Sequence, residues 1–252
     1  MQKWKFFVVI ATLMVSSYLQ ASERIQVYFP DGRDIVCING NHRYTRALYG
    51  THTLFRLETS DRPVFATFDK SRSRNIRFIL TMDGQDYALD STSYCESRYQ
   101  GGKREYILKD HRWGKGVLYV TAWASSFEEG AIWKFSSENF SLPISLTVRI
   151  CAVKNLKMKE NGELGIEPRS SFEASRPEQG LILRTWKGEG MTVLRFDNPD
   201  RITVLDSQEG RTLVLREEEA RKQLVDRVEI NTPDPYLNTL GANLVAAADG
   251  LW

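Results

Sequence analysis

The stretch Asn75-Ile76-Arg77-Phe78-Ile79-Leu80-Thr81-Met82 sets polar Asn75, Arg77 and Thr81 against apolar residues at alternate positions. Residues 144–150 alternate in the same way, with isoleucine, leucine and valine at every second position. A period of two places successive side chains on opposite faces of a strand. Each stretch therefore predicts a β-strand with one face in a core.

The spacing between strand candidates indicates how the strands pair. Asp83-Gly84 and Asn161-Gly162 mark reversals of the kind that favour tight hairpins. No helix-length periodic segment separates successive strands before Glu217, so the βαβ pattern of a parallel sheet is missing. About a dozen strand candidates in roughly 190 residues suit a fold larger than an immunoglobulin-like module. We predict a mainly β fold, a large antiparallel two-sheet β-sandwich (a supersandwich) over residues 23–215.

Two helical segments are expected after the sandwich. Residues 216–231 are rich in helix formers and predict a linker helix with a narrow apolar stripe at Ala220, Leu224 and Val228. Residues 232–252 predict an apolar helix with Asp234 at its N-cap and Pro235 at its first position. Its wide apolar stripe needs a covering surface. Either this helix folds back on the sandwich or it begins a further helical domain, and we favour the second alternative.

The first 22 residues have the pattern of a signal peptide. Lys3 and Lys5 precede an uncharged stretch at 6–15, and small residues near Ala21 and Ser22 suit cleavage. The apolar run is shorter than the roughly 20 residues that a membrane span needs. We expect a periplasmic or extracellular protein that has no membrane association after cleavage.

The charge balance argues against nucleic acid as a partner. The whole chain carries a formal net charge of +2, which falls to zero when the leader takes Lys3 and Lys5 with it. Nucleic-acid binders normally carry a basic excess or stripe. We therefore expect no nucleic-acid partner.

Three segments resemble a known family: Asn39-Gly40-Asn41-His42-Arg43-Tyr44-Thr45-Arg46-Ala47-Leu48-Tyr49-Gly50, Leu57-Glu58-Thr59-Ser60-Asp61-Arg62-Pro63, and Asn231-Thr232-Pro233-Asp234-Pro235 through Asp249-Gly250-Leu251-Trp252. They are similar to the N-terminal region of secreted bacterial six-hairpin glycosidase-like proteins. Those proteins carry a domain of unknown function ahead of an (α/α)6 barrel. The resemblance covers nearly all of the chain after the leader, and the Arg-Ala-Leu-Tyr-Gly run is its most distinctive part.

The resemblance implies an accessory role. Residues 23–215 would be the sandwich and residues 232–252 the first helix of an (α/α)6 barrel that is otherwise missing. In such proteins the catalytic carboxylates lie on the barrel, so no catalytic residue is carried over to this chain. The implied parent function is hydrolysis of glycosidic bonds in complex polysaccharides. The implied partners are the barrel itself and an oligo- or polysaccharide.

The residues alone indicate no self-contained active site, no cofactor and no metal site. The three histidines lack the short spacing and the neighbouring ligands of a metal site. A glycosidase needs two facing carboxylates about 5 to 10 Å apart, and no such pair is singled out among the many acids. The three cysteines are odd in number and far apart, so they predict no disulfide framework. These residues are His42, His52 and His111; Glu128, Glu129, Glu138, Glu160 and Glu163; and Cys37, Cys95 and Cys151.

Two groups of residues are candidates for carbohydrate binding or for contact with the barrel. The first has hydrogen-bond donors and aromatic rings after a strand and comprises Asn41, His42, Arg43, Arg46 and Tyr49, beside Tyr44. For it we rank bracing of the fold or of the barrel interface above direct sugar contact. The second comprises Trp113, Trp123 and Trp133. For these tryptophans, core packing ranks above an exposed sugar-stacking platform.

Three functional hypotheses follow. The first is a non-catalytic accessory sandwich of a secreted polysaccharide-degrading enzyme. The second is a stand-alone carbohydrate-binding β-sandwich protein, which needs exposed tryptophans. The third is an interaction protein of the envelope, which binds no sugar and covers the terminal helix with a protein partner. The first leads because of the resemblance.

Overall fold

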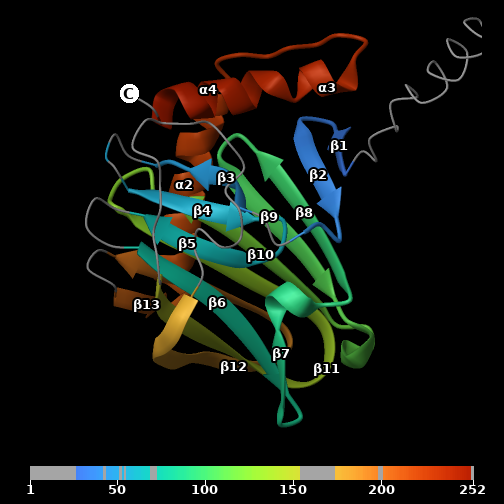
Figure 1. The fold of residues 1–252 in the computed structure, drawn as a ribbon, viewed down its shortest axis with the longest axis vertical. Coiled ribbons are helices and arrows are strands. Elements are labelled where there is room, and N and C mark those ends of the chain that lie inside the picture. The colour runs from blue at the N-terminus through green and yellow to red at the C-terminus, as the bar shows by residue number, and fades with distance from the viewer. Residues whose placement is uncertain are drawn as a thin grey trace, which may run out of the picture.

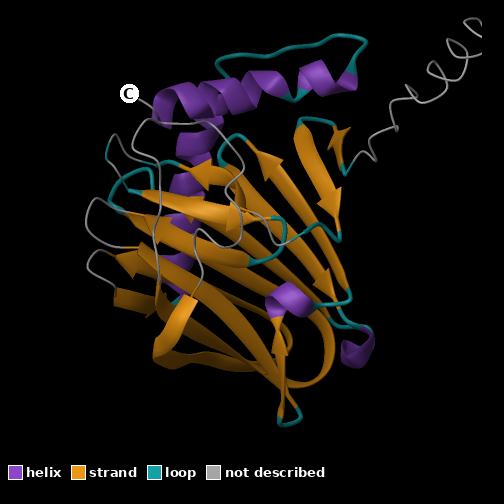
Figure 2. Ribbon diagram, viewed as in Figure 1, coloured by secondary structure: helices purple, strands orange, loops and turns teal. Residues whose placement is uncertain are grey.

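A computed structural model describes residues 27–41, 44–50, 53, 55–68, 73–153, 174–197 and 201–250. The predicted leader at 1–22, together with His42, Arg43, His52, Glu160 and Glu163, lies outside these residues. In the described part, a single antiparallel sheet curls over on itself, and the last two helices lie across one end of it (Figures 1 and 2). The prediction of a mainly β, antiparallel fold is confirmed.

The strands follow the order β1-β2-β8-β9-β10-β11-β6-β5-β4-β3, with β12 beside β11, β13 beside β12 and β7 beside β6. Two short 3-10 turns, Leu89–Ser91 and His111–Trp113, lie between strands. The strand bounds are β1 Tyr28–Asp31, β2 Asp34–Ile38, β3 Tyr44–Leu48, β4 Arg56–Ser60, β5 Val64–Phe68, β6 Ser73–Met82, β7 Gln85–Ala88, β8 Tyr94–Gln100, β9 Lys103–Lys109, β10 Val117–Ala124, β11 Gly130–Val153, β12 Ala174–Asp197 and β13 Arg201–Leu205.

The long strand β11 joins the two layers. Its first half, from Ala131 to Glu138, pairs with β10, whereas its second half, from Ile144 to Ala152, pairs with β6. Between the halves, the register with β12 shifts on both sides of Phe140. Irregularities of this kind bend a strand and increase its twist. The predicted two layers are therefore halves of one hydrogen-bonded sheet that is folded at this bend.

The core lies between the two layers. Phe65 of β5 and Phe78 of β6 meet Trp133 of β11 edge to face, at centroid distances of 5.6 and 5.5 Å. The Tyr106 hydroxyl donates to the Ser60 carbonyl at 2.7 Å and joins β9 to the end of β4. The alternating stretches bury the predicted apolar faces in this core: Ile76, Phe78, Leu80 and Met82 from β6, and Ile144, Leu146, Val148 and Ile150 from β11.

The first long helix begins earlier than predicted. Helix α2 spans Ser207–Val225, not 216–231, because the Asp206 carboxylate caps it by accepting from the backbone N–H groups of Gln208 and Glu209 at 2.9 and 2.8 Å. The prediction of a stripe at Ala220, Leu224 and Val228 is wrong. The buried stripe of α2 is Gly210, Val214, Glu217, Arg221 and Val225.

The second predicted helix is split into α3, Pro235–Asn238, and α4, Leu240–Gly250. Asp234 is the N-cap of α3, accepting from Tyr236 N–H at 2.8 Å, and Pro235 follows it as predicted. Thr239 separates the two helices, and its hydroxyl donates to the Tyr236 carbonyl at 2.9 Å.

Helix α4 packs on α2 while α3 lies against β1 (Figure 1). Ala242 and Ala246 are buried, so one face of α4 does fold back on the preceding domain, as the less favoured alternative had it. No helix in the described ranges is long and apolar enough to cross a membrane.

Candidate functional site

The described part of the predicted segment 41–49 braces the C-terminal helices. The Arg46 guanidinium lies over the Tyr99 ring at 5.2 Å, and the Tyr49 carbonyl accepts from Arg221 Nη2 at 3.2 Å. The Tyr49 ring lies so close to Gly250 of α4 that a Cβ there would overlap with it. Asn41 is exposed. In the described residues, these contacts are of the kind that the bracing alternative predicts.

The three predicted tryptophans lie in the interior. Trp123 and Trp133 are 0% exposed, and Trp113 is 2% exposed. Trp113 packs on Phe140 at the bend of β11, with ring centroids 5.6 Å apart. Buried rings cannot stack on a sugar, so the platform interpretation is wrong for these residues and the core alternative describes them.

The other candidate ligands stay scattered. His111 is exposed, with its Nδ1 atom 3.5 Å from the Asp110 carboxylate, and Glu138 accepts from the Tyr119 hydroxyl at 3.1 Å. Among the residues that the structure describes, no group of three or more His, Cys, Asp or Glu side chains is arranged to hold a metal ion. The three cysteines are buried free thiols.

Helix α2 docks on the sandwich through a buried carboxylate. Glu217 is fully buried and accepts from the Ser125 hydroxyl at 2.8 Å and from Ser126 N–H at 3.0 Å. These serines begin the loop between β10 and β11. A buried carboxylate needs such donors because burial removes its water. Glu217 therefore fixes the position of this loop, residues 125–129.

One turn further along α2, Arg221 binds backbone carbonyl groups of the sandwich, as Glu217 binds hydrogen-bond donors. Its guanidinium donates to the carbonyls of Gly101, Tyr49 and Ala124 at 3.1, 3.2 and 3.3 Å. Burial lowers the pKa of this guanidinium below its ordinary value, although nearby acidic groups oppose the shift. Arg221 thus ties the β8–β9 turn, the segment after β3 and the end of β10 to one helix.

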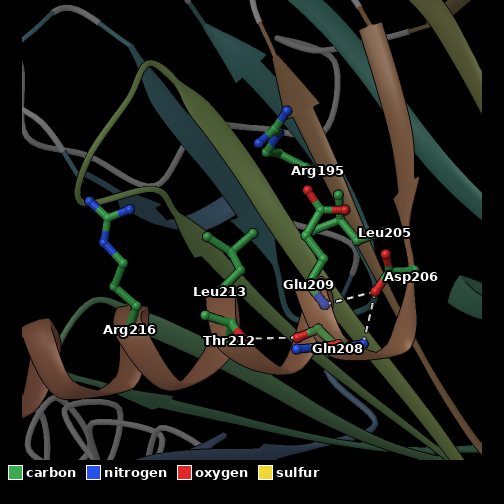
Figure 3. Close-up of a pocket in the computed structure, with 8 residues that line it drawn as sticks. All are labelled: Arg195, Leu205, Asp206, Gln208, Glu209, Thr212, Leu213 and Arg216. Atoms are coloured by element: carbon green, nitrogen blue, oxygen red, sulfur yellow. Dashed lines mark hydrogen bonds between the residues drawn. The ribbon is translucent and has the colours of Figure 1, made fainter.

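A hollow of about 410 Å³ lies beside the first half of α2, and we call it the α2 hollow (Figure 3). Helix α2 forms one wall, while β12 and β13 supply the other. Its lining residues are Arg195, Leu205, Asp206, Gln208, Glu209, Thr212, Leu213 and Arg216. This volume is within the range of about 300 to 1,000 Å³ that is typical of small-molecule sites.

The loop that Glu217 fixes contacts both arginines of the hollow. The Arg216 guanidinium lies over the Phe127 ring, with its central carbon 3.5 Å from the ring centroid. Arg195 Nε lies 3.7 Å from the Glu128 carboxylate. The loop therefore contacts both guanidinium groups although it does not line the hollow. The hollow itself brings together cationic hydrogen-bond donors, hydrogen-bond acceptors and apolar side chains.

Sequence reasoning did not identify the α2 hollow. Its residues come from β12, β13 and α2, and the loop that supports it is far away in the sequence. One signal was available: Glu217 and Arg221 lie four residues apart, so they share one face of the helix. The spacing of apolar residues placed the packed face of this helix at Ala220, Leu224 and Val228 instead, and this signal was not used.

Residues 72–194 match a family model described as a domain of unknown function (DUF4450), so the chain contains a DUF4450 domain. The match runs from the start of β6 into the second half of β12, and it includes Glu128 but leaves out α2. No curated protein matches the chain.

Proposed function

We propose that this chain is a non-catalytic accessory domain of a secreted six-hairpin glycoside hydrolase that acts on complex polysaccharide. In this proposal the domain works in the periplasm or outside the cell, and the outer face of α3 and α4 docks on the (α/α)6 barrel. The observation that carries the proposal is the exposed apolar side chains of that face: Tyr236, Leu237, Leu240 and Leu244.

The exposure is large for leucines on neighbouring turns. Leu237 is 44% exposed and Leu244 is 59% exposed, whereas Ala242 and Ala246 on the inner face are buried. Clustered apolar side chains on a surface mark interaction sites more often than isolated ones do. A barrel of helices would offer the apolar grooves into which such side chains pack.

Three buried carboxylates of the described region support a non-catalytic role. Asp61 accepts from the Tyr28 hydroxyl at 2.7 Å and lies 3.2 Å from Arg104 Nη2. Asp110 accepts from Arg112, and Glu217 holds loop 125–129. Each of these three acids is hydrogen-bonded to a neighbouring residue that it holds in place, which supports a structural role for it.

The test is site-specific photo-cross-linking in the source cell. A photoreactive amino acid replaces Leu244, and cross-linked peptides are identified by mass spectrometry. We expect cross-links to a helical glycoside hydrolase domain, on the same chain or on another. The matched control places the same group at Leu142, which is exposed on the bend of β11 and should give no such product.

Cross-links from Leu244 only to proteins without hydrolase domains would contradict the proposal and favour an envelope interaction protein. A second assay addresses catalysis directly. The purified chain should release no reducing ends from polysaccharides. Hydrolysis that one carboxylate substitution abolishes would show that the domain is itself an enzyme.

A further inference from the structure

We propose that the α2 hollow binds a short stretch of uncharged, hydroxyl-rich polysaccharide. The inference rests on the proposed function for the class of ligand, and it deepens that function by giving the accessory domain its own contact with the substrate. The site itself is argued from the lining residues of the hollow.

The lining combines hydrogen-bond donors with acceptors. Arg195 and Arg216 supply guanidinium donors, and Glu209 supplies a carboxylate acceptor. The Thr212 hydroxyl donates to the Gln208 carbonyl at 2.9 Å, so its oxygen is oriented to accept a further bond. Each sugar hydroxyl both donates and accepts, and it therefore finds partners of both kinds here.

The same lining disfavours an anionic ligand. Asp206 and Glu209 line the same hollow as the two arginines, and the Glu128 carboxylate lies 3.7 Å from Arg195 Nε. A phosphate or a uronate would be repelled by these acids. The start of α2 offers no alternative anion site, because Asp206 already accepts from the N–H groups of Gln208 and Glu209.

An apolar surface accompanies the polar groups. The buried Leu205 and Leu213, which lies one turn of α2 after Glu209, both line the hollow (Figure 3). Sugars present C–H patches as well as hydroxyl groups, and a site with a few placed polar groups on an apolar lining is typical of small-ligand pockets.

The arginines are held before any ligand arrives. Phe127 supports Arg216, and Glu217 fixes the loop that carries Phe127 by accepting from Ser125 and Ser126. Side chains that are already ordered lose less conformational entropy on binding. Glu217 is a positioning residue for the hollow, since it acts through the loop and does not line the site.

The experiment uses the purified chain on an array of short cello-, xylo-, manno- and malto-oligosaccharides beside oligogalacturonides, followed by calorimetric titration of each retained series. We expect retention of at least one neutral series. Both Arg216→Ala and Glu209→Gln should weaken it about tenfold or more. Arg211→Ala, an exposed arginine on the same helix that does not line the hollow, should leave the affinity unchanged.

Three results would overturn the inference: retention of no neutral series, retention of galacturonides alone, or affinity that neither substitution changes. Glu209→Gln preserves side-chain shape, so it keeps the test valid if Arg216→Ala disturbs the loop, and thermal unfolding checks that each variant folds. If the chain binds no neutral oligosaccharide but Leu244 still cross-links to a hydrolase domain, the proposed polysaccharide ligand is rejected and the proposed accessory function is retained. Binding that depends on Arg216 without those cross-links would instead identify a stand-alone carbohydrate-binding protein.

Discussion

Buried polar side chains determine much of the local structure of this protein. Asp61 is one example, because it binds Tyr28 of the edge strand β1 and Arg104 of β9 at once. The free-energy cost of burying the Asp61 carboxylate is offset by these two hydrogen-bond partners, one of which is positively charged. Removing either partner would leave a buried acceptor without its bond, which is costlier than losing a surface contact.

Asp110 provides a pH-dependent test of such a group. Its hydrogen bond from Arg112 is the main cause that holds the pKa of the carboxyl below its usual range, while burial opposes the shift. A lowered folded pKa adds stability that is present above the unfolded pKa of about 4 and is lost as the pH falls below it. We expect Asp110→Asn to lower the free energy of unfolding at pH 7 by about 1 to 2 kcal/mol.

The deficit of the Asp110→Asn variant should shrink when urea unfolding is repeated at progressively lower pH, because the wild-type carboxyl then loses its advantage. Glu229→Gln, at an exposed position, is the control and should show no such trend. A deficit that stayed constant down to pH 2 would mean that shape, not charge, accounts for the role of Asp110.

The buried thiols give a second prediction at this scale. Burial raises the pKa of Cys37 to about 11 and that of Cys95 to about 12. Since the thiolate is the reactive form, neither cysteine should react with iodoacetamide at pH 8 in the native protein, and both should react in denaturant. Mass spectrometry of the alkylated chain measures this. Rapid native alkylation at either position would show that the region around Cys37 and Cys95, where Cys95 Sγ lies 3.6 Å from the Asp61 backbone oxygen, opens to solvent.

The same shifts predict how stability changes in alkali. A raised folded pKa keeps its full contribution below the unfolded thiol pKa of about 8.5, and that contribution is lost as the pH rises toward the folded value. Thermal stability should therefore begin to fall above this pH, as unfolded thiols ionise while folded ones stay protonated.

At the scale of elements, the attachment of α2 departs most from what its sequence predicts. The spacing of apolar residues predicted that Ala220, Leu224 and Val228 face the sandwich. In the structure, Glu217 and Arg221 are buried there instead. The reason is that the second half of α2 covers loops and strand ends, where backbone N–H and C=O groups need polar partners that leucine cannot provide. Amphipathic patterns find helix faces that cover apolar layers, and they miss faces that cover exposed backbone.

Glu217→Gln tests this attachment. An amide still accepts one hydrogen bond but loses the charge that binds Ser125 and Ser126, so we expect a loss of about 1 to 3 kcal/mol in urea unfolding. Glu219→Gln changes an exposed residue on the same helix and should stay within about 0.5 kcal/mol of wild type. Equal effects of the two substitutions would contradict the proposed role of Glu217.

The β8–β9 turn gives an independent test of Arg221. Gly102 has φ of +75°, and a Cβ there would overlap with the Arg221 guanidinium, whereas Gly84 has φ of +69° with open space around it. Alanine at either position costs about 1 to 2 kcal/mol of backbone strain. Gly102→Ala should cost clearly more than Gly84→Ala, because it also displaces the guanidinium. Similar losses in chemical denaturation would indicate that Arg221 moves aside freely.

For the molecule as a whole, the sequence predicted the class of fold, but it did not predict that one sheet folds over on itself to form both layers. The alternation at 75–82 and 144–150 follows directly from burial of one strand face, so it could be read locally. The bend at Phe140 depends on how β11 pairs with β6, β10 and β12, which no local pattern encodes. The α2 hollow was hidden for the same reason, since it joins Arg195, Arg216 and loop 125–129 only after the sheet closes.

The C-terminal helices should be the least stable part of the assembled domain. Helix α4 is attached through small buried side chains, Ala242 and Ala246, and through the side-chain amide oxygen Oδ1 of Asn243, which accepts from Gly101 N–H at 2.9 Å. The sheet core instead buries large rings such as Trp133. Regions with little buried apolar surface open at a lower free energy than the core. We expect hydrogen exchange to show α4 amides opening before those of β6 and β11.

Asn243→Ala should lower protection in α4 by about tenfold and leave β6 unchanged, because it removes one bond of about 1 kcal/mol from the attachment alone. Gln223→Ala, which removes an exposed hydrogen bond to Glu219 on α2, is the matched control and should alter neither region. If α4 and β6 exchanged at one rate in the wild type, the helices and sheet would unfold as one unit. Docking on a barrel would then have little local opening to suppress, whereas separate opening would make α4 the element that a bound barrel protects.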